Sequence, residues 1–238
     1  MNNIFGIIPA RKGSTRIKNK NMQLLAGKPL IQHTFEAVFN SKNVNYSIVS
    51  TDDENIISLA LNMGISAPFV RPTTLAQENS LVVDAIKHAL EWYKEEFRLL
   101  PDYFILLAPT SPFRDSKDID NAIKKILDTG KDSLVSVCPV IQHPAECITI
   151  NKDGKLRFIE IEGMDITQGT QNYKEYFFID GSICICKTLA FLDHYYKLGV
   201  LFDKDSEIYI MEKSHSIDIN EKFDLDLACA LYNHYHSK

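Results

Sequence analysis

Five cations are concentrated in the loop sequence RKGSTRIKNK, which directly follows a short apolar run near the amino terminus. They are Arg11, Lys12, Arg16, Lys18 and Lys20. The next acidic residue along the chain is Glu36, so nothing nearby in the sequence neutralises them. Gly13 and Ser14 allow the backbone to turn tightly and to aim N–H groups at an anion. The pattern predicts a site for a compact polyanion; the structural alternative is a solvated basic turn or a nuclear-localisation patch.

The overall composition limits the kind of anion. The chain has 238 residues, of which 45% are hydrophobic and 24% are charged, as expected for one large α/β domain with a sizeable core. Its formal net charge is −5, which argues against a partner such as nucleic acid or a membrane surface, because proteins that bind these carry positive charge over a whole face. The basic loop is therefore local and suits a small polyanion.

The cysteines and the amino terminus indicate the compartment. Five cysteines are an odd number without CxxC spacing, which favours buried free thiols in a reducing cytosol over disulfides or a zinc site. The first residues do not form a signal peptide, and no apolar run is long enough to span a membrane. We expect a cytoplasmic protein.

Strands and helices are predicted to alternate along the first half of the chain. The apolar runs NIFGIIP, YSIVST, YFILLAP and DSLVSVCPV are typical of buried central strands. Helical patterns separate them at 29–40, 53–62, 81–97 and 116–129, the last with Ser116 as its N-cap. This order predicts an α/β fold with a mainly parallel open sheet that is covered by helices on both faces.

The rhythm changes after Val140. The stretch CITINKDGKLRFIEI predicts a hairpin that turns at Asp153 and Gly154. A strand GSICIC, a helix from Thr188, a strand EIYIM and a last helix at 223–235 follow. We interpret 1–238 as a single domain with an inserted segment at about 139–177.

Three polar clusters, PARKGSTR, STDD and APTSPFR, each follow a predicted strand. The carboxyl ends of strands in an open parallel sheet are where ligands bind. The first cluster is neither a Walker A loop nor GxGxxG, because the spacings differ and no Gly-Lys-Ser/Thr is present. Its place directly after a buried strand favours a phosphate-binding loop over a solvated turn.

These motifs carry a family resemblance. IIPARKGSTRIKNKN, STDD, VRPTTLA, LLAPTSPFR and SIDINEKFDLDLA occur in the order and at the spacings of the acylneuraminate cytidylyltransferases, which activate sialic acid and related nonulosonic acids. The resemblance covers nearly the whole chain. It implies a fold of nucleotide-diphospho-sugar transferase type, a homodimer built through the insertion, CTP as the donor and Mg²⁺ as the cofactor. The implied products are a CMP-sugar and pyrophosphate.

The resemblance also implies roles for individual residues. The catalytic set is Arg11, Lys20 and Asp218. The nucleotide-binding set is Arg11, Gly13, Ser14, Arg16, Asn21, Arg71, Ser80, Ala108, Pro109 and Thr110. The sugar-binding set is Ser111, Phe178 and Asp180. For Arg71 the structural alternative is a solvated Arg-Pro corner.

The expected metal site is the sequence SIDIN. Asp218 and Asn220 are two residues apart, so in an extended stretch both side chains point the same way and can meet one cation. Many relatives have a second aspartate where this chain has Asn220. An amide oxygen still ligates Mg²⁺ but brings no charge, so a lower metal affinity is expected. The alternatives are that Asn220 only caps the next helix and that the chain is a catalytically impaired nucleotide-binding protein.

Two further departures concern the acceptor. Sialic-acid enzymes usually have glutamine where this chain has Ala108, and an arginine and an asparagine where it has Phe178 and Asp180. Losing these hydrogen-bonding groups favours a less polar nonulosonic acid, of legionaminic or pseudaminic type. Alternatively, Phe178 is a core residue and Asp180 a turn residue. Another family, the 3-deoxy-manno-octulosonate cytidylyltransferases, shares PARxxSxR, which Thr15 and Arg16 fit, but APTSP speaks against it.

Overall fold

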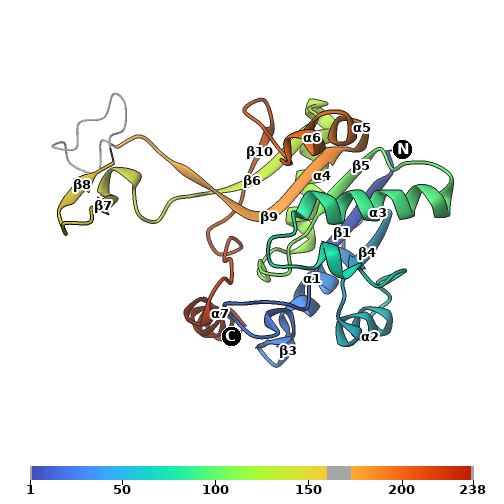
Figure 1. The fold of residues 1–238 in the computed structure, drawn as a ribbon, viewed down its shortest axis with the longest axis horizontal. Helices are drawn as coiled ribbons and strands as arrows, with labels where there is room; N and C mark the ends of the chain where they lie inside the picture. The colour runs from blue at the N-terminus through green and yellow to red at the C-terminus, as the bar shows by residue number, and fades with distance from the viewer. Residues whose placement is uncertain (1, 160–172, 237–238) are drawn as a thin grey trace.

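The computed structural model describes residues 2–159 and 173–236 of the chain. Its centre is a six-stranded sheet with the order β10-β6-β9-β5-β1-β4 (Figure 1). The strands are β1 (Ile4–Pro9), β4 (Tyr46–Ser50), β5 (Tyr103–Leu106), β6 (Ser133–Pro139), β9 (Phe177–Lys187) and β10 (Glu207–Ile210). β1 is parallel to β4 and β5, and β10 is parallel to β6, whereas β9 runs antiparallel to β5 and β6. The predicted mainly parallel α/β sheet is confirmed.

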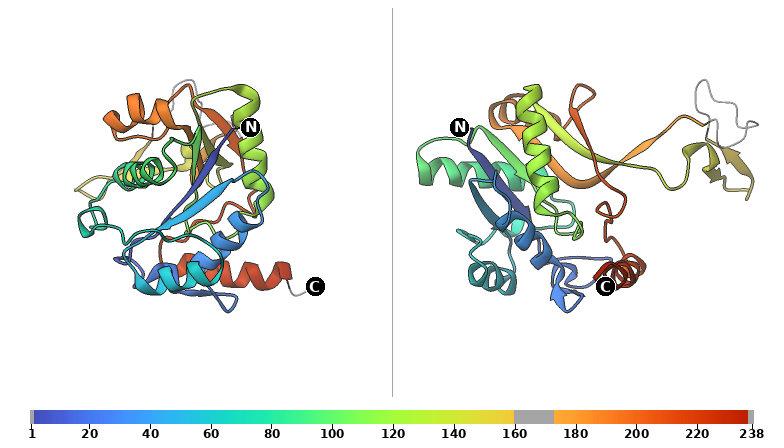
Figure 2. Two further views of the ribbon diagram at one scale, coloured as in Figure 1. Left: turned by 90° about the vertical axis from the view of Figure 1, so that its right-hand side faces the viewer. Right: turned by 180° about the vertical axis from the view of Figure 1, so that it is seen from behind.

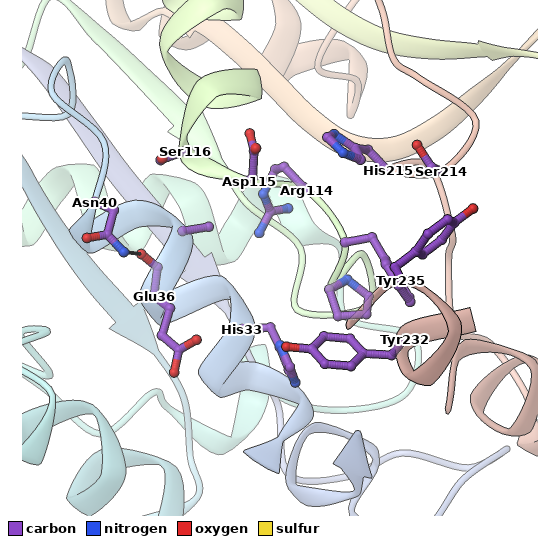
Figure 3. Close-up of a pocket in the computed structure, with 13 residues that line it drawn as sticks. His33, Glu36, Asn40, Arg114, Asp115, Ser116, Ser214, His215, Tyr232 and Tyr235 are labelled. Carbon is purple, nitrogen blue, oxygen red and sulfur yellow. Dashed lines mark hydrogen bonds between the residues drawn. The ribbon is translucent and has the colours of Figure 1, made fainter. Parts of the chain in front are cut away.

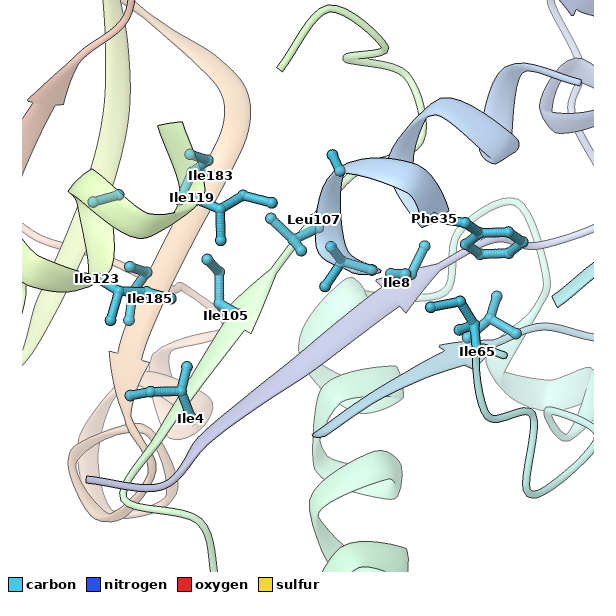
Figure 4. Close-up of a cluster of buried hydrophobic side chains, with 14 of the residues drawn as sticks. Ile4, Ile8, Phe35, Ile65, Ile105, Leu107, Ile119, Ile123, Ile183 and Ile185 are labelled. Atoms are coloured by element: carbon cyan, nitrogen blue, oxygen red, sulfur yellow. The ribbon is translucent and has the colours of Figure 1, made fainter. Parts of the chain in front are cut away.

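Helices cover both faces of this sheet, which explains why its central strands are apolar throughout (Figure 2). One face carries α1 (Leu30–Phe39), α2 (Glu54–Asn62) and α4 (Ser116–Thr129). The other carries α3 (Val82–Phe97) and the continuous segment of α5 (Thr188–Ala190), η5 (Phe191–Tyr195) and α6 (Tyr196–Leu198). Figure 4 shows the first of these interfaces, where Ile8 and Ile183 of the sheet meet Phe35 of α1 and Ile119 of α4.

A smaller core lies at the end of the sheet where the predicted site is found. Helix α7 (Lys222–His236) packs there beside the short ribbon of β2 (Leu24–Leu25) and β3 (Lys28–Pro29), with the turn η1 (Lys20–Met22) just before it. Ile17, Leu25, Ile219 and Leu225 are buried together in this core. This core therefore holds the basic loop, through Ile17, next to the SIDIN stretch, through Ile219, although the two are about two hundred residues apart in sequence.

Aspartate side chains cap the amino-terminal ends of α2 and α4. Asp53 caps α2, where its Oδ1 accepts the N–H of Asn55 at 2.9 Å. The predicted N-cap of α4, Ser116, is wrong by one residue. Asp115 accepts the N–H of Asp118 at 2.9 Å, and Asp118 accepts the N–H of Asp115 at 3.1 Å. This reciprocal capping box leaves Ser116 as the first residue of the helix.

An arm built from β6 and the first half of β9 projects from the body (Figure 1). Beyond it lie the turn η3 (Pro144–Glu146) and the predicted hairpin, formed by β7 (Ile148–Ile150) and β8 (Leu156–Phe158). Gly154 in its turn has φ +74°, which glycine adopts without strain. Residues 160–172 of the predicted insertion lie outside the described residues. The structure thus has a strand β9 longer than the predicted GSICIC, because its first residues pair with the end of β6.

Within residues 2–159 and 173–236, every helix is too short or too polar to cross a membrane.

Candidate nucleotide site

A cavity of about 210 Å³ lies at the carboxyl ends of β1 and β5. It is lined by Pro9, Arg11, Ser14, Thr15, Arg16, Ile17, Lys20, Asn21, Ala108, Pro109, Thr110 and Asn220. All but Pro9, Thr15 and Ile17 are residues singled out from the sequence. The fold therefore brings the basic loop, the APTSP loop and the SIDIN stretch to one place.

The basic loop is fastened to the neighbouring strand and to itself. The N–H of Ala10 donates to the carbonyl of Ser50 at 2.9 Å, and the N–H of Lys12 donates to Oδ1 of Asp52 at 2.7 Å. At its far end, Nδ2 of Asn21 donates to the carbonyl of Arg11 at 3.3 Å. Asp52, in the STDD cluster after β4, thus holds the loop. Asn21 likewise has an observed structural contact within the site.

The loop has bends at Lys12 and at 15–17, on either side of Gly13 and Ser14, but the glycine is not needed there for its backbone conformation. Gly13 has no positive φ, and a Cβ added there would meet no atom within 4 Å. The left-handed residue of the loop is Asn19, with φ +52°, directly before η1. Asparagine tolerates this conformation better than most residues. Gly13 does not line the cavity.

Arg11 and Lys20 each contact a backbone carbonyl, and the neighbouring arginines disfavour the charged form of Lys20. Nη1 of Arg11 donates to the carbonyl of Gln77 at 2.5 Å, and Nζ of Lys20 donates to the carbonyl of Ile219 at 2.9 Å. Burial lowers the pKa of Lys20 below the ordinary lysine value; Asp218 opposes this shift, while Arg16 and Arg11 add to it. A partly desolvated cluster of like charges is stabilised by a polyanion, which is what this loop was predicted to bind.

Asn220 lines this cavity, and Asp218, which is not itself a lining residue, contacts it from behind the cavity wall. Between them Ile219 is buried, and its N–H donates to the carbonyl of Thr110 at 2.8 Å, which places the two flanking side chains on the same side. Nδ2 of Asn220 lies 2.5 Å from Oδ2 of Asp218. Two oxygen-bearing side chains in contact fit a hard divalent cation, provided that the amide turns its oxygen toward the ion.

Asp224, and not Asn220, accepts hydrogen bonds from the backbone N–H groups just before α7. Oδ2 of Asp224 accepts the N–H groups of both Asn220 and Glu221 at 2.8 Å, ahead of α7. The side chain of Asn220 is turned to Asp218 instead. The capping role at the start of α7 therefore belongs to Asp224, and the side-chain amide of Asn220 is available to the candidate metal site.

Arg71 and Ser80, both predicted to bind nucleotide, do not line the cavity. Arg71 is 5% exposed, so the solvated-corner alternative is wrong; its Nε donates to Oγ of Ser50 at 3.0 Å, and Nη2 donates to the Ser50 carbonyl. Burial lowers the pKa of Arg71 to about 10, with Asp52 opposing the shift. Ser80 donates to the carbonyl of Thr74 at 3.0 Å, beside the turn η2 (Thr73–Leu75). Their contact with nucleotide stays a prediction.

The residues expected on the sugar side lie in different surroundings. Ser111 is buried, and its hydroxyl has no hydrogen-bond partner among the described residues. Phe178 is 39% exposed at the start of the arm, so it is not a core residue. Asp180 is 3% exposed, and both of its oxygens accept hydrogen bonds from the protein, with Ser216 among the donors at 2.7 Å. Phe178 is thus accessible to a ligand, whereas Asp180 is committed to the protein.

Sequence reasoning missed Arg114, the last residue of APTSPFR. Its Nη1 donates to the carbonyls of Ala108 at 3.2 Å and Ser182 at 2.8 Å, and its Nη2 donates to Oγ1 of Thr34 at 2.9 Å. Complete burial lowers the pKa of Arg114 to about 10, and nearby Asp118 and Asp180 oppose that shift. The guanidinium thus fixes the cavity-lining loop at Ala108 from behind. An arginine that follows Pro-Phe in a loop gives no sequence signal of burial.

A second, larger cavity of about 420 Å³ lies on the other side of the loop 112–116, between α1, α4 and α7 (Figure 3). His215 and Asp115 face it in the close-up, and with Asp118 their ligand atoms lie within 4.8 Å of one another. The two carboxylates already accept the N–H groups of the α4 capping box, and Asp118 also pairs with His215 at 2.8 Å. We assign this cluster to the start of α4.

Comparisons with known proteins agree with this geometry. A family model described as cytidylyltransferase matches residues 5–232. CMP-N,N'-diacetyllegionaminic acid synthase from Legionella pneumophila is 33% identical over 93% of this chain and 92% of its own length. N-acylneuraminate cytidylyltransferase from Escherichia coli O18:K1:H7 is also 33% identical, over 96% of this chain and 52% of that relative. Pseudaminic acid cytidylyltransferase from Campylobacter jejuni is 26% identical over 97% of this chain and 96% of its own length.

Among solved structures, CMP:2-keto-3-deoxy-manno-octonic acid synthetase complexed with CTP superposes with a TM-score of 0.70. It covers 98% of this chain and 99% of its own, and at 16% identity it shows the fold alone. The predicted fold, family and enzyme class are confirmed. The chain belongs to the cytidylyltransferase family and is a nucleotidyltransferase.

Proposed function

We propose that the protein transfers CMP from CTP to a nonulosonic acid, giving a CMP-sugar and pyrophosphate. One observation carries this proposal: Arg11, Arg16, Lys20 and Asn220 line one cavity with the APTSP loop at the carboxyl ends of the strands. Relatives that are 33% identical over most of the chain are named for legionaminic and N-acylneuraminic acids. The sequence motifs, the geometry and the relatives thus support the same chemistry.

In the proposed reaction a hydroxyl of the sugar acid attacks the α-phosphorus of CTP. A new P–O bond to the sugar forms, the bond from the α-phosphorus to the β-phosphate oxygen breaks, and the hydroxyl proton is released. Negative charge builds on the phosphoryl oxygens and on the departing pyrophosphate. Arg11 and Lys20 are held before the reaction by the contacts described above, and Arg16 lines the same cavity, so the three cations are already placed to stabilise that charge.

The divalent cation of this reaction is proposed to bind at Asp218 and Asn220. A bound ion would supply Lewis-acid stabilisation of the phosphate oxygens. Asp218 provides the ionised ligand and Asn220 a neutral one, and the contact of Lys20 with the Ile219 carbonyl keeps a cation of the protein beside them. Mg²⁺ is the ion we propose, since it prefers carboxylate, phosphate and water oxygens.

The acceptor is proposed to be a nonulosonic acid of legionaminic or pseudaminic type. Phe178, exposed at the base of the arm, offers an apolar contact where sialic-acid enzymes have a polar side chain. The likeness to the octonic acid synthetase shows the fold alone, so it adds no support for 3-deoxy-manno-octulosonate beyond the PARxxSxR pattern. The intact set of cations at the cavity likewise argues against an impaired nucleotide-binding protein.

The arm is proposed to form a homodimer. Ile150 is 72% exposed, Leu156 56% and Phe158 48%, an apolar surface on a projecting hairpin. Such a surface is expected to be covered by another chain, and a second copy of the same arm is the partner we propose. We also propose a reducing, cytoplasmic location, because the five cysteines are free thiols, with Cys147 exposed.

Pyrophosphate release tests the reaction. With one nonulosonic acid present, we expect release from CTP that stops when a chelator removes the divalent ion. ATP, GTP and UTP should give much less product. Comparable turnover with any of these three would refute the choice of CTP, and sedimentation of the protein as a monomer at micromolar concentration would refute the dimer.

A further inference from the structure

The carboxylate of Asp180 joins three segments of the chain at the base of the arm. Its Oδ1 accepts hydrogen bonds from Oγ of Ser136 on β6 and from the N–H of Ser182 at 3.1 Å. Its Oδ2 accepts a hydrogen bond from Oγ of Ser216 at 2.7 Å. Ser216 belongs to the stretch after β10, two residues before Asp218. Oδ1 of Asp180 therefore binds residues of the sheet, and Oδ2 binds the stretch of chain that leads to the metal site.

A β-bulge explains why Asp180 is in this position. The pairing of β6 and β9 shifts register between Val135 and Val137, and Gly181 takes φ +70° opposite the shift. Ser136 has a pairing partner in β10 but none in β9; its Oγ donates to Asp180 and accepts the N–H of Ile183 at 2.8 Å. Bulges re-aim side chains next to active sites. Here the bulge turns the carboxylate toward Ser216.

The stretch 211–220 has neither helix nor strand, so its path depends on few contacts. The N–H of Met211 donates to the carbonyl of Val137 at one end, and the N–H of Ile219 donates to that of Thr110 at the other, both at 2.8 Å. Between these two points the side chains of His215 and Ser216 tie it to Asp118 and Asp180. The Ser216 contact is the nearer of these two to Asp218.

The Asp180 carboxylate is almost completely buried, which requires stabilising partners. An ionised group that is 3% exposed is costly unless it is fully hydrogen-bonded and compensated. Compensation comes from Arg114, which is buried nearby and donates to the carbonyl of Ser182 at 2.8 Å, while the N–H of Ser182 donates to Asp180. Since Arg114 also holds the carbonyl of Ala108, one buried charged network supports both the nucleotide loop and the metal stretch.

We propose that Asp180 and Ser216 are positioning residues that hold the stretch 216–220 so that Asp218 and Asn220 face the cavity together. This inference rests on the metal role of Asp218 proposed above. It replaces the sugar contact expected for Asp180 with a role through Asp218. Because β9 begins in the arm at Phe177, three residues before Asp180, and runs from there into the body, the arm and the metal site are joined at one carboxylate.

Two serine variants separate positioning from general stability. Ser216→Ala removes the hydroxyl that reaches the metal stretch, and Ser136→Ala removes the one that serves the bulge, from the same carboxylate. Mn²⁺ binding is measured by electron paramagnetic resonance with CTP present and no sugar acid, so that no turnover occurs. We expect binding about tenfold weaker in Ser216→Ala, the loss of one hydrogen bond to a charged group. Ser136→Ala should lower the melting temperature more and change Mn²⁺ binding less than about twofold.

A second measurement does not need metal or substrate. Hydrogen–deuterium exchange of the metal-free protein should be faster at the amides of 212–220 in Ser216→Ala than in Ser136→Ala, and Ser216→Thr should restore the wild-type pattern. Equal weakening of Mn²⁺ binding in both alanine variants, or none in Ser216→Ala, would overturn the positioning role. If Asp218→Asn binds Mn²⁺ like the wild type, the metal role itself fails and this inference with it.

Discussion

Replacing Asn220 by aspartate is the most informative change at the metal site. In the structure Nδ2 of Asn220 donates to Oδ2 of Asp218 at 2.5 Å, so Asn220→Asp would replace an attraction with two carboxylates in near contact. Even after relaxation to about 4 Å, the repulsion is about 1 kcal/mol in water and about 4 kcal/mol at the effective dielectric of a protein surface. The metal-free variant should melt several degrees lower than the wild type.

The divalent ion should reverse that penalty. Because the variant pair carries one more negative charge, its apparent Mg²⁺ affinity with CTP should rise, and Mg²⁺ should stabilise it more than it stabilises the wild type. Asp218→Asn should nearly abolish turnover, and Asn220→Ala should raise the Mg²⁺ requirement. The assays are thermal melting with chelator or with Mg²⁺ and CTP, and initial rate against Mg²⁺ concentration.

The helix cap provides the control. Oδ1 of Asp53 accepts the N–H of Asn55 at the start of α2, so Asp53→Ala should cost about 0.5–2 kcal/mol of unfolding free energy and leave the Mg²⁺ requirement nearly unchanged. If instead Asn220→Ala shows that loss with an unchanged metal requirement, and Asn220→Asp melts like the wild type without metal, the ligand role of Asn220 is refuted.

Three further predictions concern the cations. Arg11→Ala should weaken CTP binding about 10- to 150-fold with little change in melting temperature, because it removes one charge-assisted contact; calorimetric titration with unchanged affinity would contradict this. Since burial lowers the pKa of Lys20, its charge is present below that pKa and is lost as pH rises through it. CTP affinity should therefore fall at alkaline pH, and Lys20→Arg should move that fall to higher pH; coincident pH profiles would exclude the role. Arg114→Met should lower the free energy of unfolding by about 2–5 kcal/mol in urea melts, since it leaves buried carbonyls unpaired; a loss below about 1 kcal/mol would show that water replaces the guanidinium.

The sequence predicts those parts of the fold that depend on local pattern. Continuous apolar runs locate β1, β4, β5 and β6, because strands covered on both faces have no polar side. The cap of α4 is displaced by one residue since Asp115 and Ser116 are both good caps, and the choice depends on the reciprocal bond with Asp118. The length of β9 is missed because its first half pairs only with the arm end of β6.

For the candidate site too, the local motifs could be predicted from the sequence, whereas contacts between distant segments could not. The basic loop, the APTSP loop and the SIDIN stretch are visible as motifs, and the fold places them around one cavity. Contacts between distant segments have no local signal. From the sequence, Arg114 has no assigned role and Arg71 is predicted to contact nucleotide or to lie at a solvated corner, yet both are buried against backbone carbonyls. Asp180 reads as a turn or ligand residue, and its partners are Ser136 and Ser216 from other segments.

The transfer of CMP to a nonulosonic acid is tested most directly by mass spectrometry of the products formed from CTP, Mg²⁺ and a panel of 2-keto-3-deoxy sugar acids. The panel should include N-acetylneuraminic, legionaminic and pseudaminic acids and 3-deoxy-manno-octulosonate. We predict a CMP-linked product with a nonulosonic acid, most abundant for legionaminic or pseudaminic acid, together with one pyrophosphate for each product. A CMP product from the octulosonate alone, or none from any acid while CTP still binds, would contradict the account.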